Sequence, residues 1–315
     1  MILYLVIPCY NEEEVLGEVT LRLKEKFTSL KEKNLISEKS RVMFVDDGSH
    51  DKTWEMIRGF VKQDNMFCGV KLSHNKGHQY ALLAGLMSAK NYADCTISMD
   101  ADLQDDLNAI DKFIEKYNEG CEIVYGVRSQ RKTDTAFKRN SAQWYYKVLE
   151  KLGVEVVYNH ADFRLMSRRA LDELEKYEES NLFLRGIVPQ IGLKWDVVEY
   201  ERHERFAGES KYPLKKMLSL AFDGITSFST KPITFITVFG AILTCIGVVA
   251  MITLLIFLLT VSFSKSLLWI LSAILIVGGI QLTAIGVVGA YIGKIYGEVK
   301  HRPRYIIETI EMKNE

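Results

Sequence analysis

Four acidic residues follow one short apolar stretch of the sequence and could together hold a positive charge. The apolar stretch is residues 95–99, and Asp100, Asp102, Asp105 and Asp106 come within the next seven positions. Two carboxylates that are two residues apart at the end of a strand can point to the same side, where their oxygens suit a divalent cation. The alternative is a solvated turn, for which Asp-rich loops are common.

Two further polar clusters stand in similar places. Pro8, Tyr10 and Glu12 form one, and Asp46 and Asp47 form the other, each directly after an apolar run. Ligands of open α/β sheets bind at the carboxyl ends of the strands, so three clusters at such ends indicate a binding site better than any single motif. Taken alone, an Asp-Asp-Gly-Ser sequence is also an ordinary turn, and a Glu is expected in the first turn of a helix.

The elements that must position these clusters alternate along the chain. Strands are expected at residues 2–8, 41–45, 70–72, 95–99 and 122–127, and helices at 12–33, 53–64, 77–90 and 106–119. Asn11 is expected near the cap of the first helix, and Asp106 is expected to cap the fourth. The alternation predicts an α/β fold whose mostly parallel sheet carries helices on both faces. Neither GxGxxG nor GxxxxGK[ST] occurs, so a dinucleotide site or a kinase-type phosphate loop is unsupported.

Bulk composition excludes several classes of protein. The 315 residues carry 40 basic and 40 acidic side chains, whereas a nucleic-acid-binding protein would usually be strongly basic. The five cysteines are scattered and form no CxxC pair, which fits reduced thiols in cytosol rather than a disulfide framework or a zinc site. The apolar N-terminus has no basic segment before it and runs into Asn-Glu-Glu-Glu, which indicates a strand rather than a signal peptide.

The composition changes after Lys231. Residues 232–264 and 266–293 contain no charged side chain, and each run exceeds the ~20 residues that a helix needs to cross a membrane. A buried helix pair in a soluble core is a weak alternative, so we expect a two-helix transmembrane hairpin. Basic residues flank the hairpin on both sides while its connecting loop has only Lys265, and the positive-inside rule therefore places both ends in the cytoplasm. Gly289 and Gly293 form a GxxxG that permits association into a homo-oligomer.

The motifs VIPCYNEEE, VDDGS, Gly77-His78-Gln79 and DADLQD, in this order, resemble the family 2 glycosyltransferases with the GT-A fold. The segments HADFRLMSRRAL, RFAGESKYPLKKM and YIGKIYGEVKHRPRY look like polyprenyl-phosphate glycosyltransferases of the bactoprenol glucosyltransferase group, relatives of dolichyl-phosphate mannose synthase. The resemblance covers nearly the whole chain. One departure is that Asp106 follows the Gln-Asp pair, where the family commonly has a proline.

The resemblance implies a metal-assisted donor site. Asp100 and Asp102 resemble the DXD pair and would hold Mg²⁺ or Mn²⁺ against the diphosphate of a nucleotide sugar, with Asp102 as the more direct ligand. His78 is expected in the wall of the site rather than as a base. A glycine at the start of a helix also lets backbone amides approach the nucleotide. The implied nucleotide-binding residues are Pro8, Tyr10, Glu12, Asp46, Asp47, Lys76, Gly77, Asp100 and Ala101.

The resemblance also implies an acceptor site, with Asp102 and Asp162 as the catalytic pair. A lipid phosphate is already ionised at neutral pH, so Asp162 is expected to position sugar or acceptor more than to act as a base. The alternative is a capping Asp before a helix at Ser167. The implied phosphate-binding residues, for which a solvated basic face is the alternative, are Gln104, Arg128, Arg131, Arg164, Arg202, Arg205 and Lys211.

The predicted activity is inverting transfer of a hexose, glucose from UDP-glucose, to undecaprenyl phosphate. A cytosolic GT-A domain at 1–210 would be followed by an interfacial amphipathic helix at 211–231, two transmembrane helices at 232–293 and a cytosolic tail at 294–315. The protein is expected in the bacterial inner membrane, with both termini cytoplasmic. The alternatives are another donor (UDP-N-acetylglucosamine, UDP-galactose or an aminoarabinose-type sugar) and a non-catalytic, nucleotide-sensing membrane adaptor.

Overall fold

The computed structural model describes residues 1–128, 160–179, 182–201 and 266–313, together with a few isolated helical positions between 233 and 249. Its strands are β1 (Leu3–Cys9), β2 (Arg41–Asp46), β3 (Phe67–Leu72), β4 (Cys95–Ser98), β5 (Ile123–Arg128), β6 (His160–Ser167), β7 (Trp195–Tyr200) and β8 (Ile307–Glu311). Its helices are α1 (Leu16–Glu32), α2 (Thr53–Gln63), α3 (His78–Lys90), α4 (Ala109–Asn118), α6 (Arg168–Glu175), α7 (Leu184–Gln190) and α10 (Ser266–Val299).

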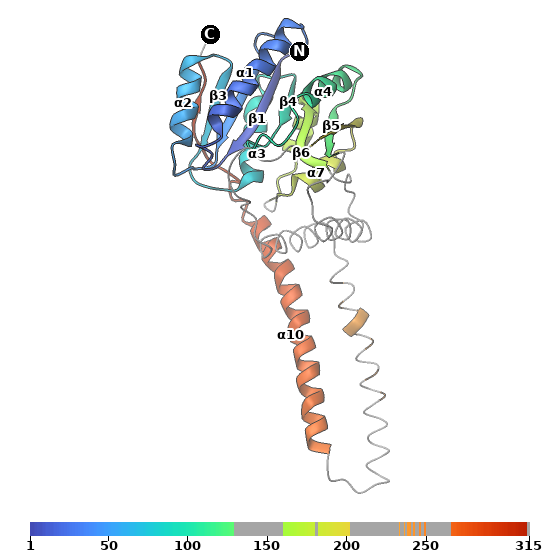
Figure 1. Ribbon diagram of the computed structural model, residues 1–315. Coiled ribbons are helices and arrows are strands. Elements are labelled where there is room, and N and C mark those ends of the chain that lie inside the picture. Colours follow the sequence, from blue (N-terminus) through green and yellow to red (C-terminus); the bar gives the residue numbers. More distant parts are fainter. Residues whose placement is uncertain are drawn as a thin grey trace.

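The strands form one eight-stranded sheet in the order β7-β5-β6-β4-β1-β2-β3-β8 (Figure 1). The central strands β4, β1, β2 and β3 pair in parallel, and β7 pairs in parallel with β5. Strand β6 lies antiparallel between β4 and β5, and β8 lies antiparallel on β3. The expected α/β fold of the GT-A kind is therefore confirmed as a mixed, mainly parallel sheet, and the two antiparallel strands are additions that the alternating pattern did not predict.

Alternate residues of each strand face opposite layers of helices, as the two-residue period of a strand requires. Leu3, Leu5 and Ile7 of β1 lie in the core beneath α1, α2 and α4. Tyr4 and Val6 lie in the second core, beneath α3, α6 and α7. Because both faces of the sheet are covered, its central strands are mainly apolar, and most of their polar side chains lie at the strand ends.

The first and fourth helices begin later than the sequence predicted. Helix α1 begins at Leu16 with Val15 at its cap, because the side chain of Asn11 instead accepts a hydrogen bond from His50 N at 2.9 Å. Helix α4 begins at Ala109 with Asn108 at its cap. Asp106 accepts from Asn108 N at 2.9 Å and so shapes the turn before α4. The expected caps at Asn11 and Asp106 are therefore both wrong.

The C-terminal strand returns to the eight-stranded sheet after α10, whereas the sequence predicted only a tail there. Val70 of β3 faces Ile310 of β8, and the ladder continues with Ser73 N donating to Ile306 O at 3.0 Å. Arg58 pairs with Glu311 at 3.3 Å and Lys71 with Glu308 at 3.0 Å. The edge of β3 is thus covered by a segment that lies more than two hundred residues further along the chain.

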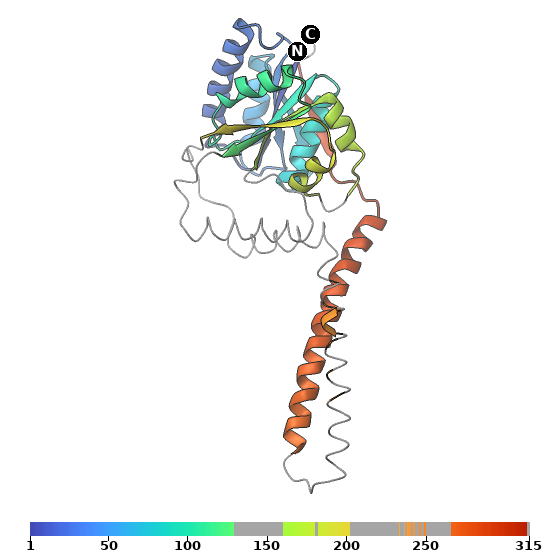
Figure 2. The ribbon, with the colours of Figure 1, turned by 90° about the vertical axis from the view of Figure 1, so that its right-hand side faces the viewer.

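Helix α10 spans 34 residues and projects away from the α/β domain in both views (Figures 1 and 2). Many of its large apolar side chains are exposed, among them Leu282, Ile285 and Ile292. Within the residues that the structure describes, no helix meets the length and hydropathy required to cross a membrane. Most of the first expected span and the whole of the expected interfacial helix lie outside the described residues.

Candidate active site

The three polar clusters meet at one edge of the sheet. Cys9 at the end of β1 faces Asp46 at the end of β2, and Val6 faces Ser98 at the end of β4. The backbone of Asp47 also donates to Cys9 O at 2.9 Å. The loops that leave β1, β2 and β4 therefore lie side by side, as the prediction from the strand ends required.

Asp46 and Asp47 are both buried, but their side chains have different environments. Oδ1 of Asp46 accepts from Ser49 N at 3.2 Å, while Oδ2 is buried and has no hydrogen-bond partner among the described residues. Burial raises the pKa of Asp46, since an ionised carboxylate is poorly solvated there. A buried acceptor without a partner is costly in the free protein, which makes Asp46 Oδ2 suited to an N–H of a ligand.

Asp47 fixes the loop that leads into α3. Its Oδ1 accepts from Lys76 N at 2.7 Å and its Oδ2 from Gly77 N at 2.8 Å. Burial raises the pKa of Asp47, although these two hydrogen bonds oppose the rise. Gly77 has a φ of 93°, which favours glycine, and it stands at the N-cap of α3. The amides of Lys76 and Gly77 are thus engaged by Asp47, and the expectation that they approach a nucleotide is not supported.

Pro8, Tyr10 and Glu12 border this part of the site. Pro8 is buried within β1, while Tyr10 and Glu12 are partly exposed in the following loop. The ring of Tyr10 lies edge-on to His50 with 6.5 Å between centroids, and Glu12 N donates to Thr53 Oγ1 at 2.9 Å. The loop after β1 is therefore held against the start of α2, across from Asp46 and Asp47.

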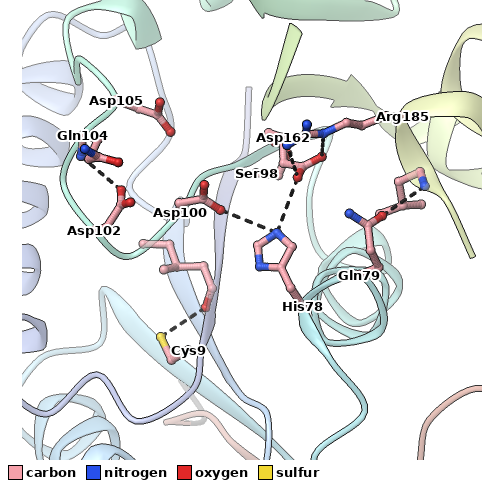
Figure 3. Close-up of polar contacts among 12 residues, drawn as sticks. Cys9, His78, Gln79, Ser98, Asp100, Asp102, Gln104, Asp105, Asp162 and Arg185 are labelled. Atoms are coloured by element: carbon pink, nitrogen blue, oxygen red, sulfur yellow. Dashed lines mark hydrogen bonds and ion pairs between the residues drawn. The ribbon is translucent and has the colours of Figure 1, made fainter. Parts of the chain in front are cut away.

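Asp100 and Asp102 lie on the loop that leaves β4, and both side chains are partly exposed (Figure 3). Asp102 Oδ1 accepts from Gln104 N at 3.2 Å, and Ala101 is buried beneath the loop. Among the residues that the structure describes, no group of three or more His, Cys, Asp or Glu side chains is arranged to hold a metal. Two accessible carboxylates nonetheless fit Mg²⁺ or Mn²⁺ when diphosphate and water supply the remaining oxygens.

A buried group of charges lies next to this loop. Asp162 of β6 is 5% exposed and accepts from Arg164 Nη2 at 2.7 Å. Arg185 of α7 donates to it twice, from Nη2 to Oδ2 at 3.0 Å and from Nε to Oδ1 at 3.2 Å. Burial alone would raise the pKa of Asp162, but Arg185, His78 and Arg164 together hold it well below the usual range. Asp162 is therefore a permanently ionised, fully engaged carboxylate.

The alternative reading of Asp162 as a helix cap is wrong. Asp162 lies inside β6, and the cap of α6 is Ser167, whose Oγ accepts from Ala170 N at 3.0 Å.

His78 bridges the two acidic parts of the site, as Figure 3 shows. Its Nε2 lies 3.5 Å from Asp100 Oδ1 and 3.6 Å from Asp162 Oδ2. Although burial lowers the pKa of His78, the carboxylates of Asp162 and Asp100 raise it to about 9. The imidazole is therefore protonated at neutral pH in this structure, which agrees with a wall residue and disagrees with a general base.

The arginines expected to clamp phosphate have different positions. Arg164 is 1% exposed and turned toward Asp162, so its burial contradicts its assignment to a phosphate clamp. Arg185, which sequence reasoning missed, is 35% exposed and reaches Asp162 from the side of the site. The Asp-x-Arg spacing of residues 162–164 within a strand could have indicated the buried pair, but nothing in the sequence marks Arg185. The expected clamp residues Arg131, Arg202, Arg205 and Lys211 lie outside the described residues.

Arg128 and Asp105 meet at the hydroxyl of Tyr200. Arg128 Nε donates to Tyr200 Oη at 3.4 Å, and Tyr200 Oη donates to Asp105 Oδ1 at 2.6 Å. Burial and the nearby Asp100 raise the pKa of Asp105 to about 6. A solvated turn, the alternative for this acidic cluster, is therefore wrong for Asp105, whose side chain is buried and partnered.

Comparison with known proteins gives a consistent result. Residues 4–175 match the sequence model of a family described as "Glycosyl transferase family 2". The chain is 54% identical over 314 residues to the uncharacterized glycosyltransferase YkoT of Bacillus subtilis (strain 168), covering 100% of this chain and 93% of that one. It is 40% identical over 314 residues to the bactoprenol glucosyl transferase of Shigella phage SfV, covering 98% and 99%. A prophage bactoprenol glucosyl transferase homolog of Escherichia coli (strain K12) is 38% identical over 312 residues, covering 98% of each chain.

Proposed function

Because this chain is a member of glycosyl transferase family 2, and so a glycosyltransferase, we propose that it transfers glucose from UDP-glucose to a polyprenyl phosphate with inversion at the anomeric carbon. The observation that carries the proposal is the position of His78, whose Nε2 lies 3.5 Å from Asp100 Oδ1 and 3.6 Å from Asp162 Oδ2, the carboxylate that also binds Arg185. Full-length relatives named as bactoprenol glucosyl transferases support glucose as the sugar and a polyprenyl phosphate as the acceptor.

The nucleotide lies between the loops that leave β1 and β2. Asp46 Oδ2, which is buried without a partner among the described residues, accepts the imide N–H of uracil. The ring of Tyr10, which is partly exposed in the loop after β1, lies along the base. Asp47 does not contact the nucleotide and instead holds the loop through residue 77.

Asp100 and Asp102 are the residues that would hold Mg²⁺ or Mn²⁺, which supplies positive charge beside the diphosphate as UDP leaves. Asp102 remains the more direct candidate, because Asp100 also faces His78 at 3.5 Å. The protonated His78 and the exposed edge of Arg185 add positive charge on the sugar side of this position. Preorganised charge of this kind stabilises a transition state that develops negative charge on the leaving group.

Asp162 acts by holding neighbouring cationic side chains in place. A carboxylate whose pKa is held well below its usual range by two arginines and a histidine is a poor proton acceptor. The lipid phosphate does not need one, because an ionised phosphate oxygen attacks the anomeric carbon while the bond from that carbon to the UDP oxygen breaks and its electrons pass to UDP. Asp162 keeps Arg185 and His78 aimed at these phosphates.

The acceptor is a membrane lipid, so the enzyme is anchored by residues 232–293 as two spans, with the catalytic domain and both termini in the cytoplasm of a bacterium. The charge-free sequence of these residues supports this anchor. The exposed apolar side chains of α10, such as Leu282 and Ile285, also support it. Basic residues Arg202, Arg205 and Lys211 are placed by their sequence just before the anchor, at the depth of lipid headgroups.

The test is formation of the lipid product. Purified full-length protein would be incubated with undecaprenyl phosphate, Mg²⁺ or Mn²⁺ and, in separate reactions, labelled UDP-glucose, UDP-N-acetylglucosamine and UDP-galactose, and then extracted into organic solvent. Label in the lipid phase from UDP-glucose alone is expected, and it should disappear in Asp102→Asn. Label from another sugar would overturn the donor, and UDP binding without any lipid label would favour the nucleotide-sensing adaptor.

A further inference from the structure

The loop that carries Asp100 and Asp102 is held at its far end by a residue of another strand. We propose that Asp105 and Tyr200 form a positioning pair that keeps this loop in the shape that binds the divalent cation. The inference rests on the proposed function, since it takes the metal role of Asp100 and Asp102 as its premise. Neither Asp105 nor Tyr200 contacts substrate in this proposal.

The loop needs such support because its backbone is strained. Leu103 has a φ of 55°, a left-handed conformation that a branched apolar residue rarely adopts. Strained residues of this kind persist only where their surroundings fix them, and they are common at functional sites. Leu103 lies directly after Asp102, so relaxation of its backbone would change the position of the Asp102 carboxylate.

The contact between Asp105 and Tyr200 opposes that relaxation. Tyr200 Oη donates to Asp105 Oδ1 at 2.6 Å, and both side chains are buried. Water therefore cannot readily replace the hydrogen bond if the loop moves, and a buried carboxylate would lose its partner. Since Asp105 is two residues beyond Leu103, the contact fixes the chain just after the strained position.

The hydroxyl of Tyr200 is itself located by close packing. The Tyr200 ring stands perpendicular to Phe163 with 5.2 Å between centroids, and Phe163 packs on Phe113 at 4.7 Å. A Cβ at Gly126 would lie 2.9 Å from Tyr200 Cε1 and 2.7 Å from Phe163 O, so only glycine leaves room for this ring. Arg128 donates to the hydroxyl from the other side, which leaves the hydroxyl proton for Asp105.

Tyr200 also ends the strand that precedes the basic segment beginning at Arg202. The hydroxyl of Tyr200 thus joins the loop that carries Asp100 and Asp102 to strand β7, which in the sequence precedes the expected acceptor residues.

The experiment compares UDP binding with and without Mn²⁺ in full-length protein, measured by titration calorimetry. Tyr200→Phe removes the hydroxyl and keeps the ring, and it is expected to weaken UDP binding in Mn²⁺ by about tenfold while leaving metal-free UDP binding nearly unchanged. Its melting temperature should fall, because the buried Asp105 loses its donor. Tyr117→Phe, a partly buried tyrosine of the same core, is the matched control and should change neither UDP affinity nor the melting temperature. Asp105→Asn keeps an acceptor for the hydroxyl, so its UDP affinity in Mn²⁺ should stay close to that of the unmodified protein. Asp105→Leu removes the acceptor and should lose as much UDP affinity as Tyr200→Phe.

The outcomes separate this inference from the proposed function. If the unmodified protein shows no Mn²⁺-dependent UDP binding, the metal role fails and the pair fails with it. If that binding is present but Tyr200→Phe does not alter it, only the pair is overturned. The positioning pair would also be overturned if Asp105→Asn and Asp105→Leu lost Mn²⁺-dependent UDP affinity equally while Tyr200→Phe kept it. Asp105 would then act through its charge. If Tyr200→Phe lowers UDP affinity by the same factor with and without Mn²⁺, the pair gives only general structural support, and the proposal is overturned.

Discussion

The carboxylate of Asp47 and the backbone of Gly77 are joined by a 2.8 Å hydrogen bond, and the second oxygen of Asp47 binds the neighbouring amide of Lys76 at 2.7 Å. Gly77 caps α3, and the first residue of α3 is His78, which lies between Asp100 and Asp162. Asp47, at the end of β2, therefore helps to position His78 against Asp100, which follows β4. The proposed nucleotide and sugar sites are joined through the loop that precedes α3.

Asp47→Ala should lower both stability and nucleotide affinity. It leaves two backbone amides without their acceptor and frees the loop before α3, which should cost about 2 kcal/mol of the free energy of unfolding. UDP affinity should fall because the loop faces the base site. Chemical denaturation and UDP titration measure the two effects. Asp64→Ala, which removes a carboxylate that accepts Met66 N far from the site, should lower stability without changing UDP affinity.

Asp46→Asn should separate binding from stability. Burial raises the pKa of Asp46, so the ionised form destabilises the fold once the pH exceeds that raised pKa. The neutral amide avoids this penalty, and the variant should be at least as stable as the unmodified protein at pH 7. Its advantage should shrink as the pH falls and Asp46 takes up a proton. UDP affinity should fall, and a variant that is less stable at pH 7 and binds UDP normally would contradict both expectations.

Asp162→Asn should be among the most damaging single substitutions in the described part of the chain. It leaves Arg164 almost completely buried without its counter-charge, and breaking a buried ion pair in this way typically costs about 3 kcal/mol or more. Transfer activity should be lost with it. Denaturant unfolding of the full chain tests the prediction. Little loss of stability, together with an acid limb in the pH–rate profile of the unmodified enzyme that is missing from the residual activity of the variant, would instead support Asp162 as a base.

Arg185→Lys and Arg164→Lys should have different effects although both remove a guanidinium from Asp162. Arg185 is partly exposed and faces the site, so its replacement should lower kcat/KM for lipid phosphate by about tenfold or more, with a stability change below about 1 kcal/mol. Arg164 is buried, so its replacement should act mainly through stability. Steady-state kinetics at saturating donor and thermal unfolding measure the two effects. A larger stability loss in Arg185→Lys than in Arg164→Lys would contradict the prediction.

Removal of residues 305–313, which include β8, should destabilise the α/β domain by about 3 kcal/mol, since Tyr305 and Ile307 pack on the second core. It should also promote aggregation, because the edge of β3 becomes available to other chains. Denaturation and light scattering of the full-length and shortened proteins test this. The double exchange Arg58→Glu with Glu311→Arg keeps the strand and is the control, and it should have a small effect because the pair is exposed.

The elements around the donor site were predictable because their signals are local. The strand that ends at Cys9 and the strand that ends at Asp46 are apolar runs closed by turn residues, and both were expected at nearly their observed bounds. The helix starts were less accurate, since Asn11 is occupied by a tertiary contact with His50 that short-range spacing does not encode.

The parts that could not be predicted depend on residues distant in sequence. Arg164 was expected among the phosphate-binding residues, and its pairing with Asp162, two residues away on the same face of β6, is the one contact of this group that local spacing could have indicated. Arg185 completes that group from a helix more than twenty residues further along. Asp105 could not be distinguished from its acidic neighbours, because only the folded sheet brings Tyr200 to it.

Strand β8 also has a consequence for the order of events during synthesis. The ribosome delivers β3 early and β8 only after all of α10, so the edge of the sheet stays unpaired while the intervening residues are made. If the apolar segments enter the bilayer as they emerge, insertion precedes completion of the catalytic domain. An unpaired edge is prone to associate with other chains. The nascent enzyme would then be most vulnerable during translation of residues 73–306, and a holding chaperone or a slow stretch of translation there would affect its yield more than its final stability.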